Sequence, residues 1–187
     1  MTETIDPPFD DEGHIDLTAL RMGSGEGRRM AVPLSLEALT LSEDRYDTAL
    51  TAEPARLDVA RMLGGGWSMR LRFDATISGP CMRCLQPTSA AVDVDSRELD
   101  ERSGDAQLDS PYVDGDTLDV VRWANDGLVL ALPARVLCRE DCRGLCPECG
   151  ADLNADPEHR HEGVRDPRWN ALDGLRFDDE GRLVDGG

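Results

Sequence analysis

Residues 67–78 read WSMRLRFDATIS, which is the most regular pattern in the chain. Apolar side chains occupy every odd position of this stretch, and polar or charged side chains occupy every even position. Because successive side chains of a strand point to opposite faces, this period of two predicts a long strand with one buried face and one wet face. Half-buried strands of this kind are typical of antiparallel sheets.

Two hairpins are expected around this strand. A shorter apolar run that contains Leu57 and Val59 precedes it, and Gly64-Gly65-Gly66 separates the two with residues that accept a positive φ in a tight turn. On the other side, the alternating residues 91–99 follow after Cys81-Met82-Arg83-Cys84. The first CxxC motif is therefore expected at the tip of the second hairpin.

Two helices are expected in the second half of the chain. Thr117 is a candidate N-cap for a helix that runs past Leu128 and ends before Pro133. Asp166, followed by Pro167 in the first turn, is typical of a second helix start. Together these elements predict an α+β fold: an antiparallel β-sheet with hairpins, few helices and a zinc-binding cysteine block.

The 187 residues are expected to build one main core. Residues 1–13 are interpreted as a flexible acidic N-terminus, 14–176 as a single domain and 177–187 as a flexible tail. Within the domain, the glycine-rich residues 23–29 are expected to be flexible, and the acidic residues 93–119 are expected to be mostly a solvated loop. Residues 14–20 and 30–36 are weaker strand candidates.

The formal net charge is −18, with 38 acidic against 20 basic residues. Such a charge repels phosphate, so naked RNA is not expected as the primary ligand. A basic protein partner is more compatible with the negative electrostatic field of the chain. Residues 93–119 are the candidate acidic docking surface. No stretch approaches the roughly 20 apolar residues of a membrane span, and the start of the chain lacks the features of a secretion signal. The protein is therefore expected to be cytoplasmic.

Thiols stay reduced in the cytoplasm, so the six cysteines indicate metal or redox chemistry rather than disulfides. Residues 137–154 read LCREDCRGLCPECGADLN, and closely spaced cysteines of this kind can wrap one zinc ion. The preferred ligand set is local and consists of Cys138, Cys142, Cys146 and Cys149. The alternative set pairs the hairpin cysteines with the last two and consists of Cys81, Cys84, Cys146 and Cys149.

In the alternative set, Cys138 and Cys142 remain for another site, with His159 or His161 as possible extra ligands. Both sets fill all four positions with protein, which favours structural Zn²⁺ over catalysis. A thiol redox pair at Cys81 and Cys84 is a weaker hypothesis, because a thioredoxin-like CxxC opens a helix rather than a hairpin tip. The common nucleophile, nucleotide and metalloprotease motifs are missing from the sequence, so the protein is not expected to be an enzyme.

The order of these motifs resembles the YceD family of large ribosomal RNA subunit accumulation proteins. The resemblance covers roughly residues 15–176 and is carried by four stretches: CMRCL (81–85), LALP (130–133), the cysteine block (137–154) and DPRWNALDGL (166–175). It implies a non-enzymatic factor in 23S ribosomal RNA accumulation and ribosome biogenesis. Members of the family often carry further cysteines where this chain has His159 and His161.

The family role and the acidic charge together lead to a specific expectation. The protein should bind a basic ribosomal protein or a large-subunit assembly intermediate, with any RNA contact indirect. A direct RNA-binding factor is the alternative, and it would use one of two arginine groups: Arg70, Arg72 and Arg83, or Arg135, Arg139 and Arg143.

Overall fold

The computed structural model describes residues 9–10, 12–101, 109–161, 168, 175–177 and 183–184. The expected long strand is β6 (Trp67–Pro80), which pairs along its whole length with β7 (Pro87–Asp100) to form the predicted hairpin. Its other edge pairs first with β5 (Ala55–Arg61) and then with β4 (Asp44–Leu50). All of these pairings are antiparallel, as the alternating sequence predicted.

Two outer strands complete this sheet. Strand β2 (Gly27–Val32) pairs with β5, and the short strand β3 (Leu39–Leu41) pairs with β4. A separate three-stranded sheet is formed by β1 (His14–Asp16), β9 (Thr117–Asp119) and β8 (Val113–Asp114). Strands β10 (Arg176–Phe177) and β11 (Leu183–Val184) pair with each other.

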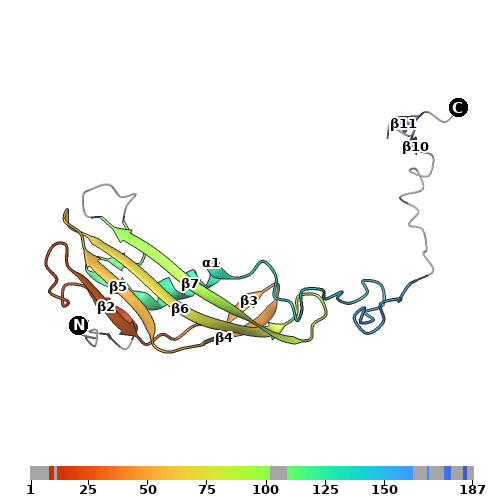
Figure 1. The fold of residues 1–187 in the computed structure, drawn as a ribbon, viewed down its shortest axis with the longest axis horizontal. Helices are drawn as coiled ribbons and strands as arrows, with labels where there is room; N and C mark the ends of the chain where they lie inside the picture. The colour runs from red at the N-terminus through yellow and green to blue at the C-terminus, as the bar shows by residue number, and fades with distance from the viewer. Residues whose placement is uncertain are drawn as a thin grey trace.

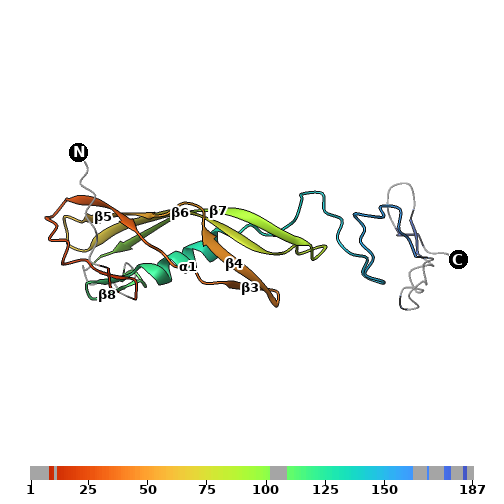
Figure 2. The same cartoon turned by 90° about the horizontal axis from the view of Figure 1, so that it is seen from below.

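The helix α1 (Val120–Ala131) runs along one face of the large sheet, while the described residues place no helix on the other face (Figures 1 and 2). The odd-numbered residues of β6 from Trp67 to Ile77 are buried beneath it, which confirms the predicted inward face. Trp67, Trp123, Leu57, Leu71 and Leu128 are among the largest fully buried side chains. Burial of such side chains at about 1.5–3 kcal/mol each makes this layer the main source of stability.

The helix begins later than the sequence suggested. Thr117 belongs to β9, and the N-cap is Asp119, whose side chain accepts a hydrogen bond from the backbone nitrogen of Arg122 at 2.9 Å. The expected cap was wrong because residues 117–119 pair with β1 and are held in an extended conformation. Gly127 lies within the helix at a close approach to β7, where a Cβ would lie 3.2 Å from Cγ1 of Val94.

Two segments for which mostly loop structure was expected contain paired strands. In the segment 23–29, Gly25 donates a backbone hydrogen bond to Arg61 and residues from Gly27 onward form β2. In the acidic segment 93–119, residues up to Asp100 belong to β7, as the predicted hairpin requires, and β8 and β9 are strands that the loop expectation missed. The helix expected from Asp166 falls largely outside the described residues.

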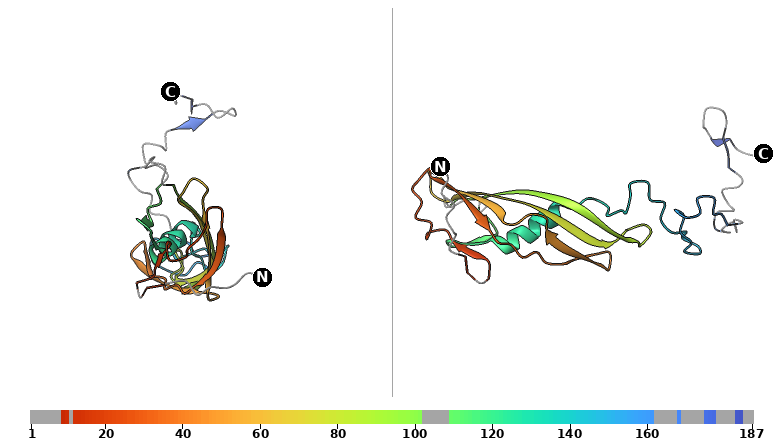
Figure 3. Two further views of the ribbon diagram at one scale, coloured as in Figure 1. Left: turned by 90° about the vertical axis from the view of Figure 1, so that its left-hand side faces the viewer. Right: turned by 60° about the horizontal axis from the view of Figure 1, so that its bottom comes forward.

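Figure 3 shows the same arrangement from two further directions, with the segment after α1 leading away from the sheet past the tip of the β6–β7 hairpin. In the described part of the chain, no helix has the length and apolar character needed to cross a bilayer.

Candidate metal centre

The tip of the β6–β7 hairpin is a tight turn that brings Cys81 and Cys84 together. The backbone nitrogen of Cys81 donates to the carbonyl of Gln86 at 2.8 Å, and that of Leu85 donates to the carbonyl of Cys81 at 2.9 Å. Leu85 adopts a left-handed conformation with φ of 61°, which turns the chain back towards β7. Both cysteines are buried as a result.

Cys138 and Cys142 from the segment after α1 complete a group of four with these two residues. The sulfurs of Cys81 and Cys142 are 3.8 Å apart, and those of Cys84 and Cys138 are 3.5 Å apart. A tetrahedral zinc site with Zn–S bonds of about 2.3 Å has sulfur–sulfur edges of about 3.8 Å. The four sulfurs therefore already have nearly the spacing of a closed four-thiolate metal site, and we call this group the four-cysteine cluster.

Backbone contacts hold the segment after α1 against the hairpin tip. Met82 donates its backbone nitrogen to the carbonyl of Val136 at 2.9 Å, and Arg83 donates from Nη1 to the carbonyl of Cys142 at 2.6 Å. Gly144 passes so close that a Cβ there would lie 2.9 Å from the carbonyl oxygen of Arg83, and its φ is +80°. The four-cysteine cluster thus joins two segments that lie more than fifty residues apart.

The electrostatics of the four-cysteine cluster favour a bound cation. Burial alone raises the pKa of the Cys81 thiol, but hydrogen bonds from the backbone amides of Cys84, Arg83 and Cys138 outweigh it and lower this pKa to about 6. The neighbouring Cys84 sulfur and burial raise the pKa of Cys138 to about 12. Four sulfurs this close cannot all ionise unless a positive charge lies between them.

A second group of four, the cysteine–histidine cluster, consists of Cys146, Cys149, His159 and His161. Cys146 Sγ lies 3.1 Å from His161 Nε2, Cys149 Sγ lies 3.2 Å from His159 Nε2, and the two Nε2 atoms are 3.0 Å apart. The two cysteines come from a tight knuckle in which the Gly150 nitrogen donates to the Cys146 carbonyl at 2.8 Å. Gly150 has a φ of +73°, a conformation that glycine adopts without a steric penalty.

The structure divides the six cysteines differently from either expected ligand set. Cys138 and Cys142 lie with Cys81 and Cys84, whereas Cys146 and Cys149 lie with His159 and His161. The preferred local grouping of the four block cysteines is therefore corrected, and so is the grouping of the hairpin pair with Cys146 and Cys149. Sequence spacing identified the candidate donors, but it could not show that the hairpin tip reaches the first block pair and leaves the second pair for the histidines.

Asn154 was missed by the sequence analysis and contacts the four-cysteine cluster. Its Nδ2 donates to Cys142 Sγ at 3.7 Å, and its Oδ1 accepts from Arg139 Nη2 and from the Arg143 backbone nitrogen, both at 2.8 Å. A hydrogen bond to a ligand sulfur stabilises its thiolate form and fixes its direction. The LN at the end of the cysteine block was the available sequence signal for this role.

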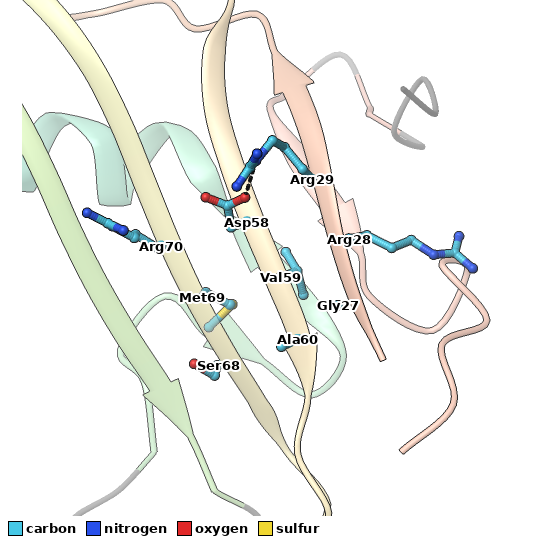
Figure 4. A pocket seen from close by; sticks show the side chains of 9 residues that line it. All are labelled: Gly27, Arg28, Arg29, Asp58, Val59, Ala60, Ser68, Met69 and Arg70. Atoms are coloured by element: carbon cyan, nitrogen blue, oxygen red, sulfur yellow. Dashed lines mark hydrogen bonds and ion pairs between the residues drawn. The ribbon is translucent and has the colours of Figure 1, made fainter. Parts of the chain in front are cut away.

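The face of the large sheet that α1 does not cover carries shallow hollows without metal-ligand clusters among the described residues. One of about 410 Å³ lies over β2, β5 and β6, and Figure 4 shows Asp58 and Arg29 facing each other within it. Arg29 Nε donates to Asp58 Oδ1 at 2.6 Å, and Arg72 also donates to this carboxylate. The carboxylate is therefore held by two arginines, which suits a structural ion pair rather than a catalytic acid or base.

Comparisons with known proteins point to one family. The family described as large ribosomal RNA subunit accumulation protein YceD matches residues 69–176, a region that begins in β6 and includes both clusters. Uncharacterized proteins of Mycobacterium bovis and Mycobacterium tuberculosis are each 31% identical over 188 residues, covering 84% of this chain and 88% of the relative. An uncharacterized protein of Mycobacterium leprae is 32% identical over 108 residues, covering 52% of this chain and 49% of the relative. No solved structure matches the chain.

Proposed function

Since the chain belongs to the YceD family of large ribosomal RNA subunit accumulation proteins, we propose that it supports 23S ribosomal RNA accumulation and large-subunit biogenesis by binding an assembly component, without catalysis. The family name implies the role in ribosomal RNA accumulation. The binding mode, the partner and a cytoplasmic location, where reduced thiols can hold a metal, are the parts that we propose.

Within this proposal, the four-cysteine cluster holds a structural Zn²⁺. Four thiolates in a tetrahedron leave no open position for water or substrate, which is typical of structural zinc sites. The ion would fasten the hairpin tip to the segment after α1, a junction where Leu137 and Leu145 are the apolar side chains, among the described residues, that pack against the buried cysteines. A redox role for Cys81 and Cys84 is less well supported, because each sulfur already has a partner from the other segment.

The hydrogen bonds of the arginines within the protein are the observation that supports a protein partner rather than RNA. Arg70 is hydrogen-bonded to Asp95 through Nε at 2.6 Å and through Nη2, Arg72 to Asp58, and Arg83 to the carbonyl of Cys142. Arginines that already neutralise internal carboxylates have little charge left for phosphate. Arg70 and Arg72 of the first group therefore support a protein partner rather than RNA, while Arg83 is held by a backbone carbonyl at the hairpin tip.

Two members of the second arginine group also make contacts within the protein. Arg139 is bound to Asn154 and lies 3.3 Å from Asp141, while Arg143 Nη1 donates to the carbonyl of Pro157 at 3.1 Å. These side chains tie the cysteine block together. Arg135, which is exposed, is the remaining member of the group.

An acidic end of the molecule suits a basic partner. The three-stranded sheet and the turn before it carry six acidic side chains that are exposed or half-buried: Asp10, Glu12, Asp16, Asp114, Asp116 and Asp119. His14 lies among them, with Nδ1 at 3.1 Å from Asp10 and Nε2 at 3.9 Å from Asp119. This end lies away from the cysteine block (Figure 2). Its charge complements the basic surface of a ribosomal protein.

Complementation of a deletion strain tests the proposal. Loss of the gene should lower the ratio of 23S to 16S ribosomal RNA, and the wild-type gene should restore it. The double variant Glu12→Gln/Asp114→Asn should restore it incompletely and should bind a purified mixture of basic ribosomal proteins more weakly. Removal of two negative charges from the acidic end weakens its attraction to a basic surface.

The matched control removes the same charge elsewhere. Glu43→Gln/Asp44→Asn, where the exposed Glu43 in the turn leads into the half-buried first residue of β4, should behave as wild type. Full complementation by the acidic-end variant would exclude this docking surface. Tight binding to 23S ribosomal RNA fragments that is lost in Arg135→Ala would establish the direct RNA-binding alternative instead.

A further inference from the structure

We propose that the cysteine–histidine cluster is a second metal site, separate from the four-cysteine cluster, which binds one Zn²⁺-class ion and holds residues 146–161 in their fold. This goes beyond the proposed role in ribosome biogenesis, because it concerns how one segment of the chain is held together. It also sets the metal content at two ions per chain.

The donors of the cysteine–histidine cluster converge on one point. Two sulfurs and two Nε2 atoms lie within 4.8 Å of one another, and the two sulfur–nitrogen contacts are 3.1 and 3.2 Å. A tetrahedron of two thiolates and two imidazoles around zinc has edges of about 3.3–3.8 Å. The four atoms need to move outward by only a few tenths of an ångström on average to surround an ion of this size.

In both histidines, the ring nitrogen Nδ1 faces a carboxylate. His161 Nδ1 lies 3.4 Å from Glu148 Oε2, and His159 Nδ1 lies 4.0 Å from Asp156 Oδ2. Metal-bound histidines commonly direct their second ring nitrogen at a carboxylate, which fixes the tautomer and raises the basicity of the ligating nitrogen. This arrangement leaves Nε2 of each ring free to bind the ion.

Residues 146–161 have almost no core of their own. Cys146 is the only buried residue among these sixteen, which are all described, and most of the others are exposed. Apolar burial on this scale cannot offset the entropy of ordering the segment. A metal ion with four protein ligands supplies the missing stabilisation, as it does in small zinc-folded modules.

Neither cysteine of this cluster is shared with the four-cysteine cluster, so the two ions are held independently. The cysteine–histidine cluster is also more open, with Cys149 and His161 exposed, whereas three of the four ligands in the four-cysteine cluster are buried. An ion at an exposed site exchanges with solvent and chelators more readily than one at a buried site. We therefore expect the second metal to be the first to leave.

The test is a metal count on the full-length chain, purified without an affinity tag and loaded with Zn²⁺ or Co²⁺. The wild type should hold about two ions per chain by elemental analysis and native mass spectrometry. The double variant His159→Ala/His161→Ala should hold about one, and its thiolate-to-cobalt absorption should fall by about a third, because four of six thiolates remain bound. Cys149→Ser, which changes an exposed ligand, should also drop to about one ion.

Arg160→Ala is the matched control, since it changes the exposed residue between the two histidines without removing a ligand and should leave both ions in place. A single ion in the wild type would overturn the proposal and would indicate one shared cysteine site. Retention of two ions by the double histidine variant would overturn it as well. Both outcomes leave the ribosomal role untouched, because that role is measured by ribosomal RNA accumulation.

Discussion

Gly79 marks a point in β6 where the backbone passes directly over a buried aromatic ring. A Cβ at this position would lie 2.4 Å from Cδ1 of Tyr46, whose ring is fully buried. The ring cannot retreat easily, because the Tyr46 hydroxyl donates to the carbonyl of Pro80 at 2.7 Å. We expect Gly79→Ala to lower the free energy of unfolding by about 1–3 kcal/mol, the usual cost of overpacking, as measured by urea denaturation.

Gly64→Ala is the control for this substitution. A Cβ there meets nothing within 4 Å, so its unfolding free energy should stay within about 0.5 kcal/mol of wild type. Equal stabilities of the two variants would show that the contact between Gly79 and Tyr46 is not a constraint.

The contribution of the Asp58 carboxylate to the free energy of unfolding is expected to depend on pH. Burial alone raises the pKa of this carboxyl, but the hydrogen bonds and charges of Arg29 and Arg72 outweigh it and hold the pKa below its usual 3.8. A folded-state pKa below the unfolded one gives stability that is present above the unfolded pKa and is lost as the pH falls through the folded pKa. Asp58→Asn should therefore cost about 1–2 kcal/mol at pH 7, and its difference from wild type should shrink below about pH 4.

Urea midpoints of wild type and variant, compared at each pH, isolate this contribution, because any acid-induced loss of metal affects both proteins alike. Asp47→Asn is the comparison, since Asp47 and its partner Arg45 are 74% and 75% exposed and such pairs contribute little. A difference between wild type and Asp58→Asn that does not change with pH would contradict the ion-pair explanation.

At the scale of elements, the start of α1 distinguishes the structure from the sequence-based expectation. Asp119 accepts the hydrogen bond of the first turn, whereas Thr117 is an exposed residue of β9. We expect Asp119→Ala to cost about 1 kcal/mol of unfolding free energy and Thr117→Ala much less, by thermal or urea denaturation. The reverse order would restore Thr117 as the cap.

The elements that the sequence predicted well are those with a strong local signal. Six inward positions in β6 were readable from period-two alternation alone, and the hairpin with β7 followed from the residues after Cys84. Strands β3 and β4 were missed, because Tyr46 is the only fully buried residue of β4. The place of β4 is set by pairing with β6, and that of β3 by pairing with β4. Pairing between distant segments also explains the errors at residues 23–29 and at Thr117.

In the candidate site too, local features were predictable from the sequence, whereas contacts between distant segments were not. The donor types and the knuckle at Cys146 and Cys149 were visible in the sequence, because their spacing is a local property. The grouping of donors depends on which distant segments meet, and the carboxylates behind the histidines depend on the fold of the loop. Neither of these could be obtained from spacing.

At the scale of the whole molecule, two regions are stabilised by different means. The sheet and α1 enclose one apolar core that contains Trp67 and Trp123, whereas the buried cysteines of the hairpin tip form a separate small cluster. The first region can stay folded on apolar burial alone, and the second depends on its metal ligands. Metal loss should therefore free the cysteine block without unfolding the sheet.

Limited trypsin digestion tests this separation, because the chain contains no lysine and trypsin can cut only after its arginines. After the metal is stripped and the chelator removed, we expect cleavage after Arg139, Arg143 and Arg160 to rise at least about tenfold, since an opened segment is cut in proportion to its open population. Cleavage after Arg56, Arg70 and Arg72 in the sheet should stay slow, and the near-ultraviolet circular dichroism of the buried tryptophans should be retained. Re-addition of Zn²⁺ should restore protection of the block. If the sheet arginines instead became accessible at the same rate as those of the block, the metal centres would support the whole fold rather than the block alone.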